Sequence, residues 1–300
     1  MSDHTDETIS HQVATGSGIE IAVTEFAGTG PVLLLVHATG FCGAVLEPMA
    51  SQLAGSFRCI AIDLRGHGRS GSPIDEEGPL VPSEHDGYQW SALAQDVTDV
   101  INALDIKSPY GFGHSCGGAT LLLAELANPG TFAGMYLYEP VVIPGPPMPP
   151  MIAGNRLAEG ALRRRETFAS RRDAMENFSR KPPFDQLHPA ALTAYVNCGF
   201  SDEPDGSVRL RCDPRHESLV YAHGLSHDAY GRLTEITCPV TLACGQESDA
   251  FGPDVLGKVA KRLGMGPVEV LPILGHFGPL QDPAMVASSV SAFLSPKAAT

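Results

Sequence analysis

The chain has few basic residues and no long apolar run. It contains 20 Lys and Arg against 34 Asp and Glu, a formal net charge of −14, so its average surface would repel nucleic acids and anionic membranes. No apolar run approaches the ~18 residues that a membrane span needs. The polar, acidic first residues also lack the basic and apolar regions of a signal peptide. We therefore expect a soluble cytoplasmic protein that binds neither nucleic acid nor membranes.

Paired metal-ligand and disulfide patterns are also missing. The seven cysteines form an odd set without a C-x-x-C pair, which favours reduced thiols over a disulfide framework or a zinc site. His223 and His227 have i, i+4 spacing. The intervening Gly224 and the absence of a nearby acidic ligand argue against a metal site there.

Apolar runs and helical patterns alternate along most of the chain, which predicts an α/β fold with a mostly parallel sheet covered by helices on both faces. The first dozen residues are polar, and we expect them to be loose. A half-exposed strand is expected over 19–26, and further strands over 32–36, 57–62, 109–113, 132–142, 240–244 and 268–271. Helices are expected over 46–53, 90–104, 119–127, 255–263 and 283–294.

The character of the sequence changes at Ile143. Five prolines crowd residues 144–150, and no buried strand is evident from Met151 to about Tyr230. We expect a helical cap over 143–230, inserted between core segments 1–142 and 231–300. Residues 156–181 hold eight basic and four acidic side chains. They form either a solvated helix face or a segment that overhangs the site and attracts anionic substrates.

One glycine pattern imitates a nucleotide site. Gly66, Gly68 and Gly71 spell G-x-G-x-x-G after an expected strand, the outline of the dinucleotide-binding fingerprint. That fingerprint requires a helix to begin at its last glycine. The chain continues instead into Ser72-Pro73 and a loop rich in Gly, Pro and acidic residues, so a nucleotide cofactor is not expected.

A second glycine pattern carries the chemistry. Gly113-His114-Ser115-Cys116-Gly117 lies between an expected strand and an expected helix. A G-x-S-x-G turn at such a junction strains the backbone and needs neighbours without side chains, so that strand and helix can pass closely. The serine hydroxyl then stands clear of the sheet, where it can meet a base.

Four motifs in order resemble the α/β-hydrolase superfamily over nearly the whole chain. They are His37-Ala38-Thr39-Gly40, residues 63–70 (DLRGHGRS), the G-x-S-x-G turn, and Gly275-His276-Phe277. The resemblance implies an α/β-hydrolase fold with Ser115 as the nucleophile and His276 as the general base. Serine rather than aspartate at position 115 disfavours epoxide hydrolysis and dehalogenation.

The resemblance leaves the third catalytic residue open. The family often places the acid as G-x-x-D after the strand that is expected to end at Cys244, and here the sequence is one residue longer. Asp249 is the leading candidate, Glu247 is the near alternative, and Glu139 holds a position that some members use instead. The acid is expected to orient His276 and to stabilise the imidazolium.

The oxyanion hole implied by the resemblance consists of the backbone N–H groups of Thr39 and Cys116. The family commonly has His-Gly where this chain has His37-Ala38. Alanine is more restricted than glycine, so this loop is expected to differ slightly. Cys116 is expected to act through its backbone; its thiol as the nucleophile is the minor alternative.

These residues together predict a serine hydrolase that cleaves a carboxylic ester or lactone through an acyl-enzyme, with no metal or organic cofactor. Its partner would be a small-molecule substrate, with an anionic one favoured by the basic segment. Amide hydrolysis and carbon–carbon cleavage would use the same residues. A receptor that keeps the triad only for binding is the alternative from another class. The substrate and the oligomeric state cannot be read from the sequence.

Overall fold

The computed structural model describes residues 9–73 and 78–294. Of the N-terminal stretch expected to be loose, residues 1–8 lie outside the described residues, and the rest enters a strand that the sequence did not predict. This strand, β1 (Ile9–Ala14), pairs antiparallel with β2 (Glu20–Glu25) at one edge of the main sheet. No helix in the described ranges is both long and apolar enough to cross a bilayer.

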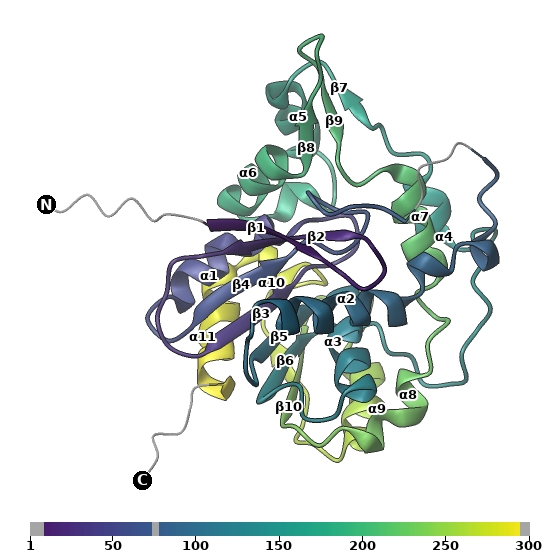
Figure 1. Ribbon diagram of the computed structural model, residues 1–300. Helices are drawn as coiled ribbons and strands as arrows, with labels where there is room; N and C mark the ends of the chain where they lie inside the picture. Colours follow the sequence, from purple (N-terminus) through teal and green to yellow (C-terminus); the bar gives the residue numbers. More distant parts are fainter. Residues whose placement is uncertain (1–8, 74–77, 295–300) are drawn as a thin grey trace, which may run out of the picture.

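The main sheet has eight strands in the order β1-β2-β4-β3-β5-β6-β10-β11. The strands from β4 to β11 in this order run parallel, and β1 and β2 are antiparallel to their neighbours. Figure 1 shows this sheet at the centre of the molecule. Its remaining strands are β3 (Val32–Val36), β4 (Arg58–Ile62), β5 (Tyr110–His114), β6 (Gly134–Tyr138), β10 (Val240–Gly245) and β11 (Glu269–Leu271).

Strand β3 explains why the apolar run 32–36 is continuous. Leu34 and Val36 belong to one hydrophobic cluster of the core, whereas Leu33 and Leu35 belong to a second cluster on the opposite face. Successive side chains of a strand point to opposite faces, so a strand covered on both sides needs apolar residues at every position. The predicted buried strand is therefore confirmed.

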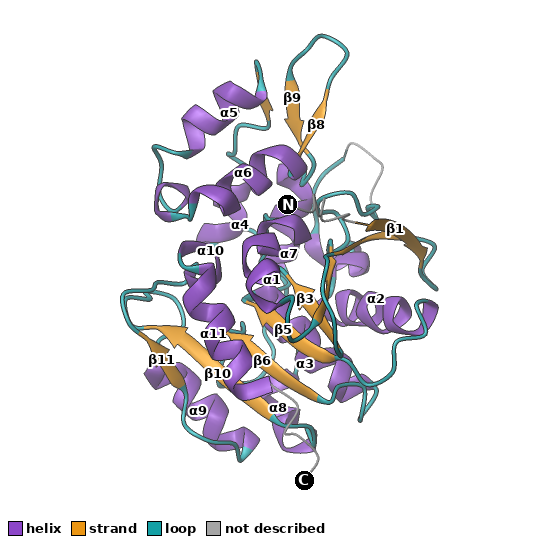
Figure 2. Cartoon of the chain, turned by 90° about the vertical axis from the view of Figure 1, so that its left-hand side faces the viewer, coloured by secondary structure: helices purple, strands orange, loops and turns teal. Residues whose placement is uncertain are grey.

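Helices cover both faces of the sheet, as expected for an α/β-hydrolase fold. Figure 2 shows α1 and α11 on one face and α2, α3 and α9 on the other, and the two core clusters divide in the same way. The predicted helical face of α2 is buried at positions 90, 93, 94, 97, 100 and 101. The helices outside the segment between β6 and β10 are α1 (Glu47–Leu53), α2 (Trp90–Ala103), α3 (Cys116–Ala127), α9 (Pro253–Leu263), α10 (Gly278–Gln281) and α11 (Pro283–Leu294).

The segment between β6 and β10 is not purely helical. The prediction that it lacks strands was wrong, because β7, β9 and β8 form a separate antiparallel sheet in that order. Strands of two or three residues are too short to show a periodic pattern. The boundaries at residues 143 and 230 stay a prediction. The elements here are α4 (Arg156–Ala161), β7 (Thr167–Phe168), α5 (Arg171–Phe178), α6 (Pro189–Cys198), β8 (Phe200–Asp202), β9 (Val208–Leu210), α7 (Pro214–Ala222) and α8 (Ala229–Arg232).

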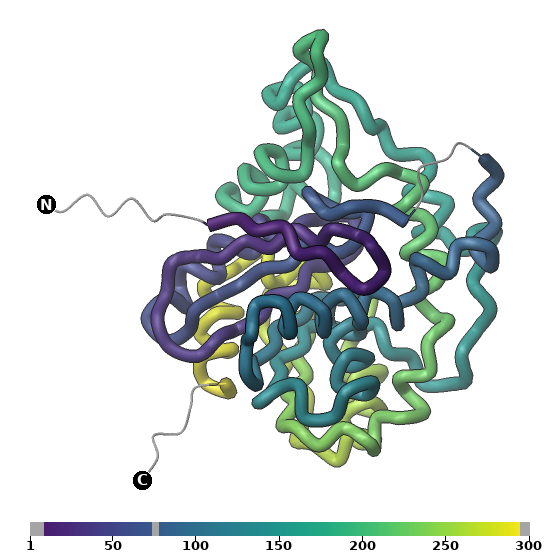
Figure 3. Tube along the Cα trace, in the orientation of Figure 1, coloured from purple at the N-terminus to yellow at the C-terminus, as the bar shows by residue number. Residues whose placement is uncertain are grey.

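An aromatic cluster joins this segment to the rest of the molecule. Phe178, Phe184 and Tyr195 contact one another with ring centroids 4.6–5.3 Å apart. Phe41, which follows β3, packs on Phe184, Tyr195 and Phe277. Figure 3 shows how the chain leaves the core for this region and returns to it. The aromatic cluster thus fixes the segment beside the loop that follows Gly275.

Candidate active site

Ser115 lies on a sharp turn between β5 and α3. Its backbone angles are φ 56° and ψ −115°, and a positive φ is one that non-glycine residues seldom adopt. Its N–H donates to Tyr138 O at 2.9 Å, and its carbonyl accepts from Gly118 and Ala119 at the start of α3. These bonds hold the strained turn, and the Ser115 side chain faces a cavity.

The two glycines of the pattern are required by close backbone contacts. A Cβ on Gly113 would lie 2.5 Å from Gly118 Cα, and a Cβ on Gly117 would lie 2.2 Å from Val36 O. Neither contact is possible for a real side chain. The predicted reason for the glycines, the close passage of strand and helix, is therefore confirmed.

His276 connects Ser115 to a carboxylate. Its Nε2 lies 3.1 Å from Ser115 Oγ, and its Nδ1 lies 2.6 Å from Glu139 Oε2. A carboxylate only accepts hydrogen bonds, so Nδ1 carries the proton and Nε2 is free to accept one from the serine. The side chain of His276 is 15% exposed, whereas that of Glu139 is fully buried. The serine–base pair predicted from the sequence is thus within hydrogen-bond distance.

The prediction that Asp249 holds His276 is wrong, since the carboxylate on Nδ1 is that of Glu139. Glu139 follows β6 with φ 46° and accepts from Gly245 N at 3.0 Å and from Ser248 Oγ at 2.7 Å. The longer loop after β10 thus directs Ser248 toward the site. Asp249 is an exposed residue that lines two cavities, and Glu247 is exposed as well.

Two residues that the sequence did not identify as positioning groups fix the His276 loop. His114 Nε2 donates to the carbonyl of His276 at 2.8 Å, and the hydroxyl of Tyr138 donates to Gly275 O at 2.8 Å. Burial lowers the pKa of His114 well below its ordinary value, which keeps the ring neutral. His114 stands inside the G-x-S-x-G pattern, and its position beside the serine was the only available signal.

The amides predicted for the oxyanion hole belong to the residue after Ser115 and to a residue of the same cavity. Thr39 lines the same cavity as Ser115, and Cys116 N is the first amide of α3. Within the described ranges, neither N–H donates to another protein group. Burial raises the pKa of the Cys116 thiol to about 12, so the thiol stays protonated at neutral pH.

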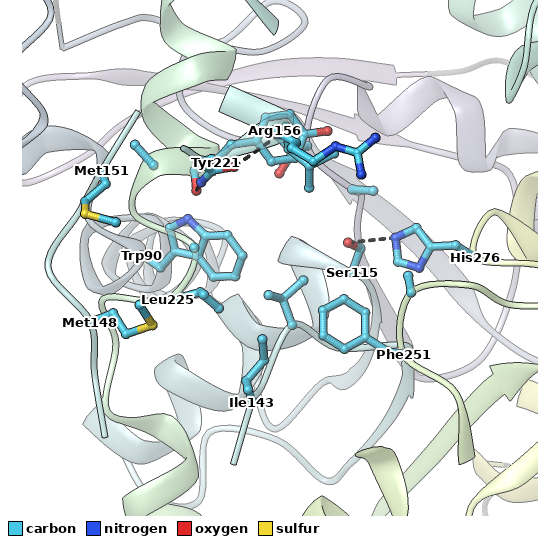
Figure 4. A pocket seen from close by; sticks show the side chains of 18 of the residues that line it. Trp90, Ser115, Ile143, Met148, Met151, Arg156, Tyr221, Leu225, Phe251 and His276 are labelled. Atoms are coloured by element: carbon cyan, nitrogen blue, oxygen red, sulfur yellow. Dashed lines mark hydrogen bonds between the residues drawn. The ribbon is translucent and has the colours of Figure 1, made fainter. Parts of the chain in front are cut away.

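The cavity at Ser115, here called the main cavity, has a volume of about 660 Å³. Figure 4 shows Ser115 and His276 at one end, with Arg156 and Tyr221 on one side. Its lining is mostly apolar and includes Trp90, Val141, Met148, Met151, Leu225 and Phe251. A concave apolar pocket with a few convergent polar groups is the usual form of a small-molecule site.

A second cavity of about 910 Å³ meets the first at Thr39, Arg156 and His276. We call it the basic cavity, because five basic and three acidic residues line it: Arg156, Arg163, Arg164, Arg165, Lys181, Glu217, Glu247 and Asp249. Arg164 pairs with Glu217, and Arg165 with Asp173. Arg156 and Arg163 have no ion-pair partner among the described residues. These two guanidinium groups are therefore available to an anionic ligand.

The i, i+4 pair His223 and His227 has structural partners. His223 and His227 each place Nε2 near a backbone carbonyl, that of Pro82 at 3.1 Å and that of Val141 at 3.0 Å. In the described part of the chain, no three His, Cys, Asp or Glu side chains are grouped to hold a metal ion. The glycines at 66 and 68 lie in a turn with positive φ. Asp63 accepts from Arg69 N in this turn and from Gly43 N in a separate segment.

Comparison with known proteins identifies a family match. A family model described as the alpha/beta hydrolase family matches residues 33–289. A 2-(acetamidomethylene)succinate hydrolase from Mesorhizobium japonicum is 24% identical over 96% of this chain and 96% of its own length.

Solved structures give the same fold. A crystal structure of E-2-(acetamidomethylene)succinate hydrolase has a TM-score of 0.79 at 23% identity and covers 97% of this chain and 100% of its own. An N-formylmaleamic acid deformylase from Pseudomonas putida has a TM-score of 0.73 at 19% identity and covers 94% and 100%, respectively.

Buried neutral histidines make the fold sensitive to acid. His37 accepts from Leu64 N at 3.0 Å and donates to Ala38 O at 2.7 Å, and burial lowers its pKa to about 4. Burial lowers the pKa of the neighbouring His67 to about 3. Both values lie below the ~6.5 of an unfolded histidine, so the unfolded chain binds protons first as the pH falls.

We predict that the free energy of unfolding falls between pH 6.5 and pH 4, by on the order of 2–4 kcal/mol for His37 alone. The stabilisation is complete above pH 6.5 and is lost as the pH falls through the folded-state pKa values. Urea unfolding at several pH values measures it. His37→Asn should weaken the slope of the free energy of unfolding against pH. His11→Asn, at an exposed position of β1, should leave that slope unchanged. An equal slope in wild type and His37→Asn would contradict the assignment.

Proposed function

This chain belongs to the alpha/beta hydrolase family, and we propose that it hydrolyses a carboxylic ester or lactone through an acyl-enzyme on Ser115. The observation that carries the proposal is the series of hydrogen bonds from Glu139 through His276 to Ser115. A nucleophile within reach of a base, which is itself oriented by a third group, is the arrangement used in covalent acyl transfer.

In the first half of the reaction, His276 Nε2 takes the proton of Ser115 as Oγ attacks the substrate carbonyl carbon. The negative charge on the carbonyl oxygen is met by the N–H groups of Thr39 and Cys116. Glu139 keeps the Nδ1 proton of His276 in place and stabilises the imidazolium. His276 then passes the serine proton to the leaving group, and the carbon–oxygen bond breaks.

In the second half, His276 deprotonates a water that attacks the acyl carbon. The second tetrahedral intermediate collapses, the bond to Oγ breaks, and Ser115 recovers its proton from His276. The carboxylic acid leaves. The serine proton leaves with the alcohol and is replaced by one from water, so the scheme balances with only residues of the chain and one water.

The second candidate is amide hydrolysis with the same residues. It is favoured by the names of the similar proteins, one an acetamidomethylene succinate hydrolase and the other a formylmaleamic acid deformylase. The amine leaving group must be protonated before it departs, and His276 is placed to do this. Turnover of matched ester and amide substrates therefore distinguishes the two bond types.

We further propose that the substrate carries an anionic group, held by Arg156. This exposed arginine lines both the main and the basic cavity. Figure 4 shows its guanidinium turned toward the end that holds Ser115 and His276. Arginine binds carboxylates through two parallel hydrogen bonds. The similar proteins also act, by their names, on a succinate and a maleamic acid derivative.

Ser115→Ala should lower kcat on 4-nitrophenyl esters by at least ~10³-fold and abolish labelling by a fluorophosphonate. Iodoacetamide at pH 7.5 should leave wild-type activity intact, since burial raises the pKa of Cys116 to about 12. Stopped-flow assays measure the activities, and mass spectrometry of the labelled peptide measures the labelling of Ser115. Full turnover by Ser115→Ala would overturn the proposal. Ligand-dependent thermal shifts with negligible turnover on ester and amide panels would indicate a receptor instead.

Arg156→Met should remove a preference for an anionic leaving group. We expect wild type to favour 3-carboxyphenyl butanoate over its neutral 3-carbamoylphenyl counterpart by about 3- to 10-fold in kcat/KM. The preference is modest because the guanidinium is exposed. Added salt should shrink it.

The matched control is Arg172→Met, which removes the same charge from an exposed position of α5 that lines none of the three cavities. It should keep the preference. If both variants, or neither, lost the preference, Arg156 would not be the binding group.

A further inference from the structure

Five large apolar side chains remain exposed around the main cavity. Ile143, Met148, Met151, Leu157 and Leu225 all line it, and they are between 37% and 62% exposed. Contiguous exposed apolar surface on a soluble protein usually marks a binding site. This surface is continuous with Ser115 through the cavity, so the occupant is part of the molecule that Ser115 attacks.

The direction of the cavity identifies which part of the substrate it holds. Figure 4 places Trp90, Met148, Met151 and Leu225 at the end away from His276. In the proposed reaction, the leaving group must lie beside His276 Nε2, because it receives the proton from that atom. The acyl group therefore extends the other way, into the apolar end.

A smaller cavity of about 260 Å³ adjoins this apolar end. We call it the side cavity; it is lined by Ile143, Pro144, Pro146, Met148, Leu225 and Tyr230, among others. Ile143, Met148 and Leu225 line both cavities and form a partition between them.

The partition combines a fixed backbone with adaptable side chains. Met148 N donates to Leu225 O at 2.8 Å, and Met151 N donates to Ala222 O at 3.3 Å. The prolines of residues 144–150 restrict the backbone further. Methionine, by contrast, is unbranched and adapts to irregular spaces. The partition backbone is thus fixed, and the side chains on it set where the main cavity ends.

We propose that the apolar end of the main cavity binds a medium-length aliphatic acyl chain, and that Leu225 limits its length by closing off the side cavity. The proposal rests on the proposed acyl-enzyme function. At the ~30 Å³ that a water occupies in the liquid, the main cavity holds about twenty non-hydrogen atoms. With about half of these needed for the reacting group and the leaving group, an acyl chain of about eight to ten carbons fits.

The test is the chain-length profile of kcat/KM on 4-nitrophenyl esters from acetate to dodecanoate. In wild type, kcat/KM should rise roughly two- to fourfold per methylene to an optimum at about eight to ten carbons. Leu225→Ala joins the cavities and should move the optimum at least two carbons longer. Leu225→Trp should lower the ratio of decanoate to acetate kcat/KM at least tenfold. Leu162→Trp, which alters an exposed leucine outside all three cavities, should reproduce the wild-type profile.

The outcomes separate this inference from the proposed function. Acetate turnover that depends on Ser115, combined with a flat or falling wild-type profile, would overturn the acyl-chain site and leave the acyl-enzyme intact. A rising profile that neither Leu225 variant alters would overturn the partition. If Leu225→Trp does not fold, the chain-length optimum of Leu225→Ala tests the partition alone, and an unchanged optimum would overturn it. Absence of Ser115-dependent turnover on all esters would overturn the proposed function itself.

Discussion

The buried carboxylate of Glu139 is the group on which the geometry of the site depends. It lies at the end of β6, where it accepts from Gly245 N at the end of β10, from the Ser248 hydroxyl and from the ring of His276. A buried charge is costly unless it is fully hydrogen-bonded. These three donors offset that cost and at the same time fix the orientation of the histidine. The Glu139 side chain therefore positions the end of β10, the loop at Ser248 and the base His276.

The strain at Ser115 belongs to the same arrangement. Ser115 and Glu139 both have positive φ, and they follow neighbouring strands β5 and β6, which pair in parallel from Tyr110 to His114. The Ser115 amide donates to Tyr138 O, one residue before Glu139. The two strained turns thus support each other at the carboxyl ends of β5 and β6. Such support from a rigid scaffold keeps sparsely populated backbone conformations in place. His276, on its own loop, completes the set through His114 and Tyr138.

Much of the fold and of the candidate site could be predicted from the sequence, because those parts depend on local patterns. The run 32–36, the helical face of 90–101 and the glycines beside Ser115 each show their role in composition or spacing. The acid could not be chosen in this way, since Asp249, Glu247 and Glu139 all follow strands and only the path of the loop after β10 decides which one reaches His276. The strands β7, β8 and β9 were missed because two or three residues carry no periodicity. The cavities depend on how distant segments pack, and a linear pattern does not encode that.

The most direct test of the account compares kcat for Glu139→Gln and Asp249→Asn on one ester, after thermal unfolding has shown that both variants are folded. A glutamine would present an amide to Nδ1 and favour the wrong tautomer of His276. We expect kcat to fall by about 10³- to 10⁴-fold for Glu139→Gln and by less than about threefold for Asp249→Asn, which alters an exposed side chain. A large loss for Asp249→Asn together with a small one for Glu139→Gln would contradict the account.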